Sequence, residues 1–307
     1  MLSERRAQTS PGEQFCIATL WALLVVALLA IAVASRQVVP VAALCLIAFV
    51  PTALLFAWAG RCPSPDIRRV SSPILQMLYW RGFIFVFVPA IPELIVSIVL
   101  VPGLQPDLQK SGAIASYLIG QFLIMAVAPG VFEELYKWWL TSFAIRSWRR
   151  REPDAAPTRS QIMLFGMFGA LGFLTVEDLL YTLTAYASGD LASAAVTIGI
   201  RVALFPIHVS LGIASAKAIA RQVADDRSPF KVRWAGIWRQ MAVHGLYNFS
   251  LTIGLSSILL AVSAYFALLL VIPLVIGIVC AVYLFLAVRE MSTPSPAVVV
   301  VAIAAEP

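Results

Sequence analysis

The stretch VFEELYKWWL, residues 131–140, places two glutamates and a lysine inside an apolar segment. It follows SGAIASYLIGQFLIMAVAPG and leads through TSFAI into the basic cluster RSWRRR, residues 146–151. The whole run is long enough to cross a membrane as a helix, which takes roughly 20 apolar residues. A charge at the centre of a bilayer costs about 2.5–3.5 kcal/mol on insertion scales, so Glu133, Glu134 and Lys137 predict a buried polar site.

The composition of the chain indicates its class. Of its 307 residues, 61% are hydrophobic and 12% are charged, and the mean hydropathy is +0.90. Soluble domains are about half apolar and about a quarter charged, so the sequence predicts an all-α, polytopic transmembrane helix bundle. The net charge of +6 comes largely from basic residues that flank apolar runs, which argues against a nucleic-acid-binding protein. The four cysteines have no CxxC spacing and predict neither disulfides nor a thiolate metal site.

Eight apolar runs predict about eight spans, at residues 15–35, 38–58, 82–102, 113–145, 161–187, 192–220, 237–257 and 259–288. An alternating path from a cytoplasmic start puts seventeen basic residues inside and only Arg36 and Lys110 outside, which predicts that both termini are cytoplasmic. The first run also resembles a signal peptide ending in AVAS, residues 32–35, but its length favours an uncleaved anchor.

The chain then divides into three predicted regions. Residues 1–81 hold two spans and a basic cytoplasmic loop, 82–257 form a core with polar residues in its spans, and 258–307 hold a last span and a disordered tail. Inside the core, GMFGALGF at 166–173 spaces glycines along a helix, which predicts that another helix packs closely against it.

Isolated polar residues also occur in the other spans of this core, and they are Glu93, Glu177, Asp178, Arg201, His208, Lys217 and His244. Helical spacing puts several on a common stripe: Glu133 with Lys137, Phe173 with Glu177 and Tyr181, Arg201 with His208, and His244 with Asn248. Pro206 predicts a kink beside His208. Four spans therefore present polar faces, which either converge on a functional site or form structural ion pairs.

Four motifs together resemble those of PrsW-type intramembrane proteases. EELYK (133–137) is similar to the EExxK motif of that family, FLTVE (173–177) to its FxxxE motif, His208 to the histidine of its next helix, and HGLYN (244–248) to its closing HxxxD. The resemblance covers about residues 82–257. Asn248 stands where the PrsW pattern has aspartate, whereas the related CAAX prenyl endopeptidase superfamily has HxxxN.

The resemblance implies an intramembrane endopeptidase that cleaves membrane-protein substrates, with anti-sigma factors as the family's theme, in a bacterial cytoplasmic membrane. It implies a catalytic set of Glu133, Glu134, Lys137, Glu177, His208, His244 and Asn248. Within this set Glu133 is the favoured general base, with Glu134 or Lys137 orienting it and Glu177 sharing the water, although the motif alone does not distinguish Glu133 from Glu134. His208 would orient water or act as acid, and His244 with Asn248 would stabilise the oxyanion.

The sequence is compatible with two catalytic mechanisms and with two other classes of protein. Glutamate alone could activate the water, or Glu177, His208 and His244 could hold a zinc ion and leave a glutamate as base. A proton- or ion-coupled transporter also uses buried acids and proline-broken helices, although the sequence shows no duplicated halves. A non-catalytic binding or immunity protein on the same scaffold would carry the same motifs.

Overall fold

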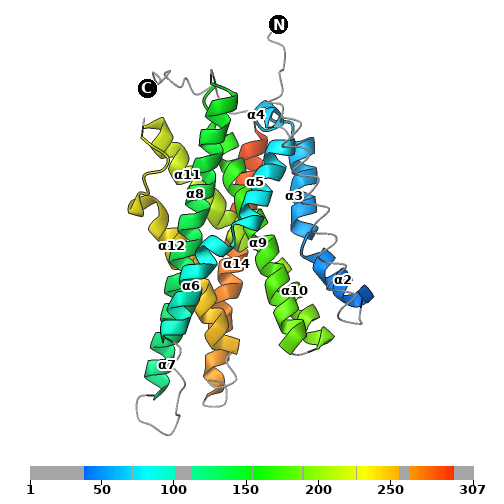
Figure 1. Cartoon of the computed structure of the whole chain (residues 1–307), viewed down its shortest axis with the longest axis vertical. Coiled ribbons are helices and arrows are strands. Elements are labelled where there is room, and N and C mark those ends of the chain that lie inside the picture. Colours follow the sequence, from blue (N-terminus) through cyan, green and yellow to red (C-terminus); the bar gives the residue numbers. More distant parts are fainter. Residues whose placement is uncertain are drawn as a thin grey trace.

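The computed structural model describes residues 38–70, 72–100, 113–153, 155–188, 190–225, 227–255 and 263–293. Over these ranges the chain is an elongated bundle of helices and contains no strand (Figure 1), which confirms the predicted all-α bundle. The first predicted span, 15–35, and most of the predicted tail lie outside the described residues.

The helices are, in chain order, α2 (Val38–Ile47), α3 (Val50–Arg61), α4 (Pro65–Arg69), α5 (Ser72–Ile84), α6 (Phe87–Leu100), α7 (Ala113–Gln121), the π-helical turn η2 (Phe122–Val127), α8 (Ala128–Arg151), α9 (Arg159–Ser188), α10 (Leu191–Ala203), α11 (Phe205–Ala224), α12 (Trp234–Leu255), the 3-10 helix η3 (Ala264–Leu270) and α14 (Val271–Ser292).

Six helical segments of the described chain are long and apolar enough to cross a membrane, namely Ala42–Arg61, Ser72–Val99, Ile114–Arg151, Arg159–Ala187, Leu191–Ala224 and Ala264–Ser292. The protein is therefore a multi-pass membrane protein. Two details differ from the sequence-based expectation. The second of these segments begins at Ser72, not at 82, because the residues before Arg81 already form α5. The predicted span 237–257 forms α12, but Arg239, Gln240 and His244 make this helix too polar to belong to the set.

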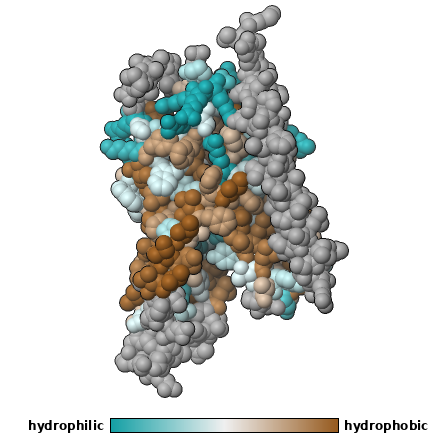
Figure 2. Space-filling model, in the orientation of Figure 1, coloured by the Kyte–Doolittle hydropathy of each residue, from teal (hydrophilic) through white to brown (hydrophobic). Residues whose placement is uncertain are grey.

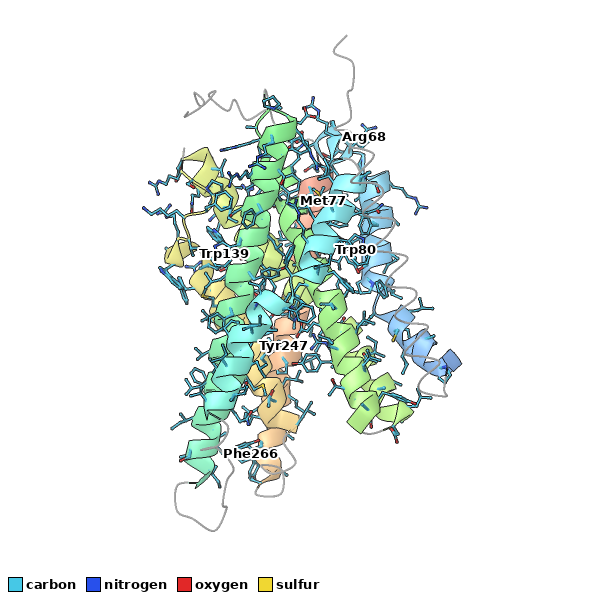
Figure 3. The ribbon with its side chains drawn as sticks, viewed as in Figure 1. Arg68, Met77, Trp80, Trp139, Tyr247 and Phe266 are labelled. Carbon is cyan, nitrogen blue, oxygen red and sulfur yellow. The ribbon has the colours of Figure 1, made fainter. Side chains whose placement is uncertain are left out.

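The surface of the bundle is divided along its length. Hydrophilic residues gather at the end where α4 lies, and apolar residues cover the middle of the face seen in Figure 2. Arg68 and Phe266 mark opposite ends of the molecule (Figure 3). Large apolar side chains such as Val99 of α6 and Phe285 of α14 are exposed, as lipid-facing residues are in a membrane.

Helix α9 forms the centre of the bundle and packs most extensively against α11 and α5. The predicted glycine stripe explains this approach. A Cβ atom added at Gly166 would lie 2.6 Å from the carbonyl oxygen of Gly212 in α11, and one added at Gly212 would lie 2.6 Å from the Cβ of Ala170. Because no side chain separates them, the two backbones are in direct contact, which brings the polar residues of α9 and α11 to the same level.

A second glycine contact, which the sequence analysis missed, joins α8 to α12. A Cβ atom at Gly130 would lie 2.7 Å from the carbonyl oxygen of Met241, and one at Gly245 would lie 2.6 Å from that of Ala126. Gly130 precedes Glu133 by about one turn, and Gly245 follows His244 directly. This close approach therefore places the histidine of α12 beside the glutamates of α8.

The helices are irregular at three places. The π-helical turn η2 lies directly before α8, and such turns occur frequently next to functional sites. The predicted kink at Pro206 is a complete break, since α10 ends at Ala203 and α11 begins at Phe205. Residues 85–86 separate α5 from α6 in the same way.

Replacing Gly212 by alanine should destabilise the fold, because the added methyl group has no room between α9 and α11. Overpacking typically costs about 1–3 kcal/mol, whereas alanine alone favours a helix by about 0.5–1 kcal/mol over glycine. Thermal unfolding of the purified protein in detergent should show a lower midpoint for Gly212→Ala. The matched control is Gly199→Ala in α10, which meets nothing within 4 Å and should leave the midpoint unchanged or raise it. Equal midpoints for the two variants would contradict the packing argument.

Candidate active site

The three charged residues of α8 lie inside the protein and contact one another. Glu134 is 0% exposed, Lys137 1% and Glu133 4%. Nζ of Lys137 donates a hydrogen bond to Oε1 of Glu134 at 2.6 Å, whereas its distance to Oε2 of Glu133 is 3.9 Å. The expected pair of Glu133 with Lys137 is thus the longer contact, and the main partner of the lysine is Glu134.

His244 of α12 reaches both glutamates. Its Nδ1 lies 2.9 Å from Oε1 of Glu134, the same oxygen that accepts the bond from Lys137. Its Nε2 lies 3.6 Å from Oε2 of Glu133. A hydrogen bond at one ring nitrogen fixes the direction in which the other nitrogen points, so Glu134 aims Nε2 of His244 at Glu133.

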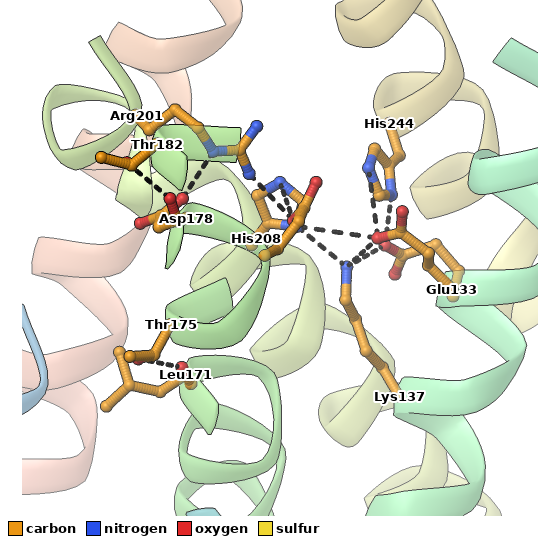
Figure 4. Close-up of polar contacts among 11 residues, drawn as sticks. Glu133, Lys137, Leu171, Thr175, Asp178, Thr182, Arg201, His208 and His244 are labelled. Atoms are coloured by element: carbon orange, nitrogen blue, oxygen red, sulfur yellow. Dashed lines mark hydrogen bonds and ion pairs between the residues drawn. The ribbon is translucent and has the colours of Figure 1, made fainter. Parts of the chain in front are cut away.

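His208 of α11 completes the contacts on the other side (Figure 4). Its Nδ1 lies 3.4 Å from Nζ of Lys137 and 3.9 Å from Oε2 of Glu133, and its Nε2 lies 3.6 Å from Oε2 of Glu177. The rings of the two histidines meet nearly at right angles, with centroids 4.8 Å apart. His208 therefore lies between the carboxylates of α8 and that of α9.

Arg201 of α10 holds the acidic residues of α9. Its Nη2 lies 2.9 Å from Oε2 of Glu177 and its Nε donates to Oδ1 of Asp178 at 2.6 Å. Arg201 and Asp178 stand out in the sequence as polar residues of apolar spans, but the motifs gave them no place in the predicted site. Their sequence positions could have predicted this contact, because Asp178 adjoins Glu177 and Arg201 lies at a similar depth in the next span. Although α10 and α11 are separate helices, Arg201 and His208 converge on the same carboxylate, Glu177.

Three polar residues of the membrane spans lie apart from this network. Asn248 is partly buried and makes no hydrogen bond or ion pair within the described ranges. Lys217 pairs with Glu290 of α14 at 2.7 Å, which belongs to another part of the bundle. Glu93 of α6 has a buried Oε1 without a hydrogen-bond partner among the described residues.

A metal ion fits the centre of this cluster. Glu133, His208 and His244 each offer one ligand atom, and these atoms lie within 4.8 Å of one another. Oε2 of Glu133 and Nε2 of both histidines are buried and have no hydrogen-bond partner among the described residues. Two histidines and one carboxylate are a donor set that zinc uses in catalytic sites. The sequence analysis expected Glu177 in this set, and the compact group has Glu133 in that position instead.

The charge balance also suits a divalent cation. Four carboxylates (Glu133, Glu134, Glu177 and Asp178) face two cations (Lys137 and Arg201), which leaves a formal charge of −2 when all four are ionised. A charge of that size cannot stay uncompensated inside a membrane protein, so it requires either a bound cation or protons on the carboxylates.

Comparison with known proteins agrees with this geometry. The model of a family described as PrsW family intramembrane metalloprotease matches residues 74–278, two thirds of the chain. The match extends beyond the expected 82–257 and ends inside α14. No curated protein and no solved structure gives a significant match. Because the match covers most of the chain and contains every residue of the buried cluster, the protein belongs to the PrsW family of intramembrane metalloproteases and is a peptidase.

Proposed function

We propose that the buried cluster of α8, α9, α11 and α12 is the catalytic centre, and that it hydrolyses peptide bonds of membrane-protein substrates. The observation that carries this proposal is the state of Glu133. Within the described ranges its Oε2 is buried without a hydrogen-bond partner, yet it lies 3.6 Å from Nε2 of His244 and 3.9 Å from Nδ1 of His208. A carboxylate held among bases with one oxygen unused is equipped to bind and activate water.

The two adjacent glutamates have different tasks in this proposal. Oε1 of Glu134 accepts hydrogen bonds from both Lys137 and His244, so Glu134 is a positioning residue that holds these two side chains in place. Glu133 is engaged less closely and takes the proton of the attacking water as general base. In this proposal Glu133 keeps the role of base that the sequence favours.

The remaining polar residues orient the reacting groups. Glu177 contacts Nε2 of His208 and is itself fixed by Arg201, so this chain of contacts sets the orientation of the His208 ring. Asn248 is a proposed donor to the oxyanion, because it lies one helical turn from His244 and is free of other partners in the described ranges. Nε2 of His244 is the second proposed donor, once its ring is protonated, because Nδ1 already donates to Glu134. Loss of one such donor costs about 10²–10³ in rate in a well-studied protease.

A zinc ion held by Glu133, His208 and His244 would polarise the scissile carbonyl and activate a water molecule. In that arrangement Glu133 serves as ligand, and the general base is a carboxylate outside the ligand set. Glu177 is then the candidate, because it lies 3.6 Å from His208 and Arg201 keeps it in place. The same residues form the centre in both versions, but their roles change: with zinc, Glu133, His208 and His244 would hold the ion and Glu177 would be the base.

The family and the distribution of basic residues support a proposal for the membrane, the orientation and the substrates of the protein. We propose that the membrane is a bacterial cytoplasmic membrane, that the basic end of the bundle faces the cytoplasm, and that the substrates include proteins resembling anti-sigma factors. The basic cluster at the end of α8 and the strong inside bias of arginine support this orientation.

Glu133→Gln should abolish proteolysis, with a loss of about 10²–10⁴-fold, because the amide cannot accept the proton of water. The measurement compares the N-termini of membrane proteins in cells that express wild type or variant at equal abundance. Glu290→Gln is the matched control, since this glutamate pairs with Lys217 and Arg159 away from the cluster. New N-termini near membrane segments should appear with wild type and control only. Identical profiles for all three, with folded proteins, would instead favour a transporter or a catalytically silent relative.

The metal requirement has a separate test. Protein purified without chelators should contain about one zinc ion per chain, and His208→Ala and His244→Ala should lose it because each removes one of the three ligands. Glu290→Gln should retain the metal. Elemental analysis of active wild-type protein that shows no stoichiometric metal would overturn the zinc version and leave catalysis by Glu133 alone.

A further inference from the structure

A cavity of about 590 Å³ opens between α8 and the helices α5 and α6, outside the buried cluster. We call it the α8 groove and define it by Tyr136, Trp139, Phe143, Arg146 and Arg150 of α8, with Phe85 and Val88 opposite them. Helices α5 and α6 both pack against α8, and the break between them, at residues 85–86, borders the groove. Its size is within the range of roughly 300–1,000 Å³ that is typical of ligand sites.

The part of the groove farther from the C-terminal end of α8 is apolar and is exposed at the surface of the bundle. Trp139 is 44% exposed and Phe143 48%, and on the opposite wall Phe85 is 51% exposed. An exposed aromatic surface of this kind can pack against another helix within a membrane.

The part of the groove at the C-terminal end of α8 is basic. Arg146 and Arg150 lie on the last turns of α8, and neither forms an ion pair with a carboxylate in the described part of the chain. The guanidinium of Arg146 instead lies 5.9 Å from the ring of Phe230. Arg81 of α5 joins them at the groove and donates a hydrogen bond to Ser147. Arginines at this position attract negative charge at the end of whatever binds below them.

The groove also has a direction. Its residues on α8 recur every three or four positions, from Arg150 back to Tyr136, so they form one stripe along the helix. Glu133 lies one turn beyond Tyr136 on the same stripe. Tyr136 packs against Phe173, whose ring lies 5.4 Å from Nζ of Lys137 in the catalytic cluster. A helix that lies in the groove therefore points toward Glu133.

We infer that the α8 groove is the docking site of the substrate, and that it selects transmembrane helices with acidic residues at the end beside Arg146 and Arg150. The role in catalysis rests on the proposed function, whereas the binding preference does not. Membrane proteins carry an excess of basic residues next to their cytoplasmic helix ends, so an acidic end would distinguish substrates from most other helices in the bilayer.

Photo-crosslinking tests the binding alone. The full-length protein, with the photoreactive residue p-benzoylphenylalanine at position 143, is reconstituted in phosphatidylcholine vesicles with a synthetic peptide of twenty Leu and Ala residues that ends in three Asp. A second peptide ends in three Gln. The acidic peptide should crosslink about three- to tenfold more than the neutral one, as expected for a few ion pairs at an interface. A photoreactive residue at position 274 on the exposed face of α14 serves as control and should show no preference.

The arginines provide the matched variants. Arg146→Gln with Arg150→Gln should remove the preference for the acidic peptide, whereas Arg149→Gln, next to them but outside the groove, should keep it. Equal crosslinking of both peptides, or no effect of the double variant, would overturn the inference. Loss of the preference when phosphatidylglycerol replaces half of the phosphatidylcholine would also overturn it and assign the arginines to a lipid headgroup. Binding without any cleavage would count against the proposed function only, since the assay does not depend on proteolysis.

Discussion

The bundle depends on how the carboxylate of Glu134 is accommodated at membrane depth. Its side chain is completely buried, and one oxygen accepts hydrogen bonds from Lys137 on the same helix and from His244 on α12. An unpaired charge at this depth costs about 2.5–3.5 kcal/mol on insertion scales, which is a large share of the roughly 5–15 kcal/mol by which most proteins are stable. The contact between α8 and α12, which Gly130 and Gly245 make possible, is therefore needed to bring His244 to the charge of Glu134 as well as to pack the two helices.

The same constraint extends across the bundle and creates the site. His208 lies between Lys137 and Glu177, and Arg201 joins Glu177 to Asp178, so one polar network links α8, α9, α10, α11 and α12. Each member compensates the charge of its neighbours, which makes the network costly to interrupt. Each of the four carboxylates has a buried oxygen without a hydrogen-bond partner in the described ranges, but Glu133 has the longest ion-pair distance to a cation, 3.9 Å to Lys137. The bundle thus holds four carboxylates in place and leaves one of them, Glu133, available for the proposed catalysis.

The sequence predicted the helical class, the glycine contact of α9 and most residues of the network, because charges in apolar runs and helical spacing are local features. It says less about contacts that depend on neighbouring helices. Spacing predicted the pair of Lys137 with Glu133, which is present at 3.9 Å, but not the shorter contact of the lysine with Glu134, whose Oε1 also contacts His244. The compact ligand group contains Glu133 because Arg201 engages Glu177, and nothing in the motifs reveals that pairing. Asn248 matched a motif, yet no contact in the described ranges ties it to the cluster.

The central claim is that Glu134 holds the bundle together while Glu133 reacts. Thermal unfolding of purified Glu134→Gln and Glu133→Gln, compared with wild type in the same detergent, tests it most directly. Removing one partner of a buried ion pair costs about 3–5 kcal/mol, so Glu134→Gln should unfold at a much lower temperature. Glu133→Gln should unfold close to wild type, because no hydrogen bond to its Oε2 is lost. Equal destabilisation by both variants, or a stable Glu134→Gln, would contradict the division of roles between the two glutamates.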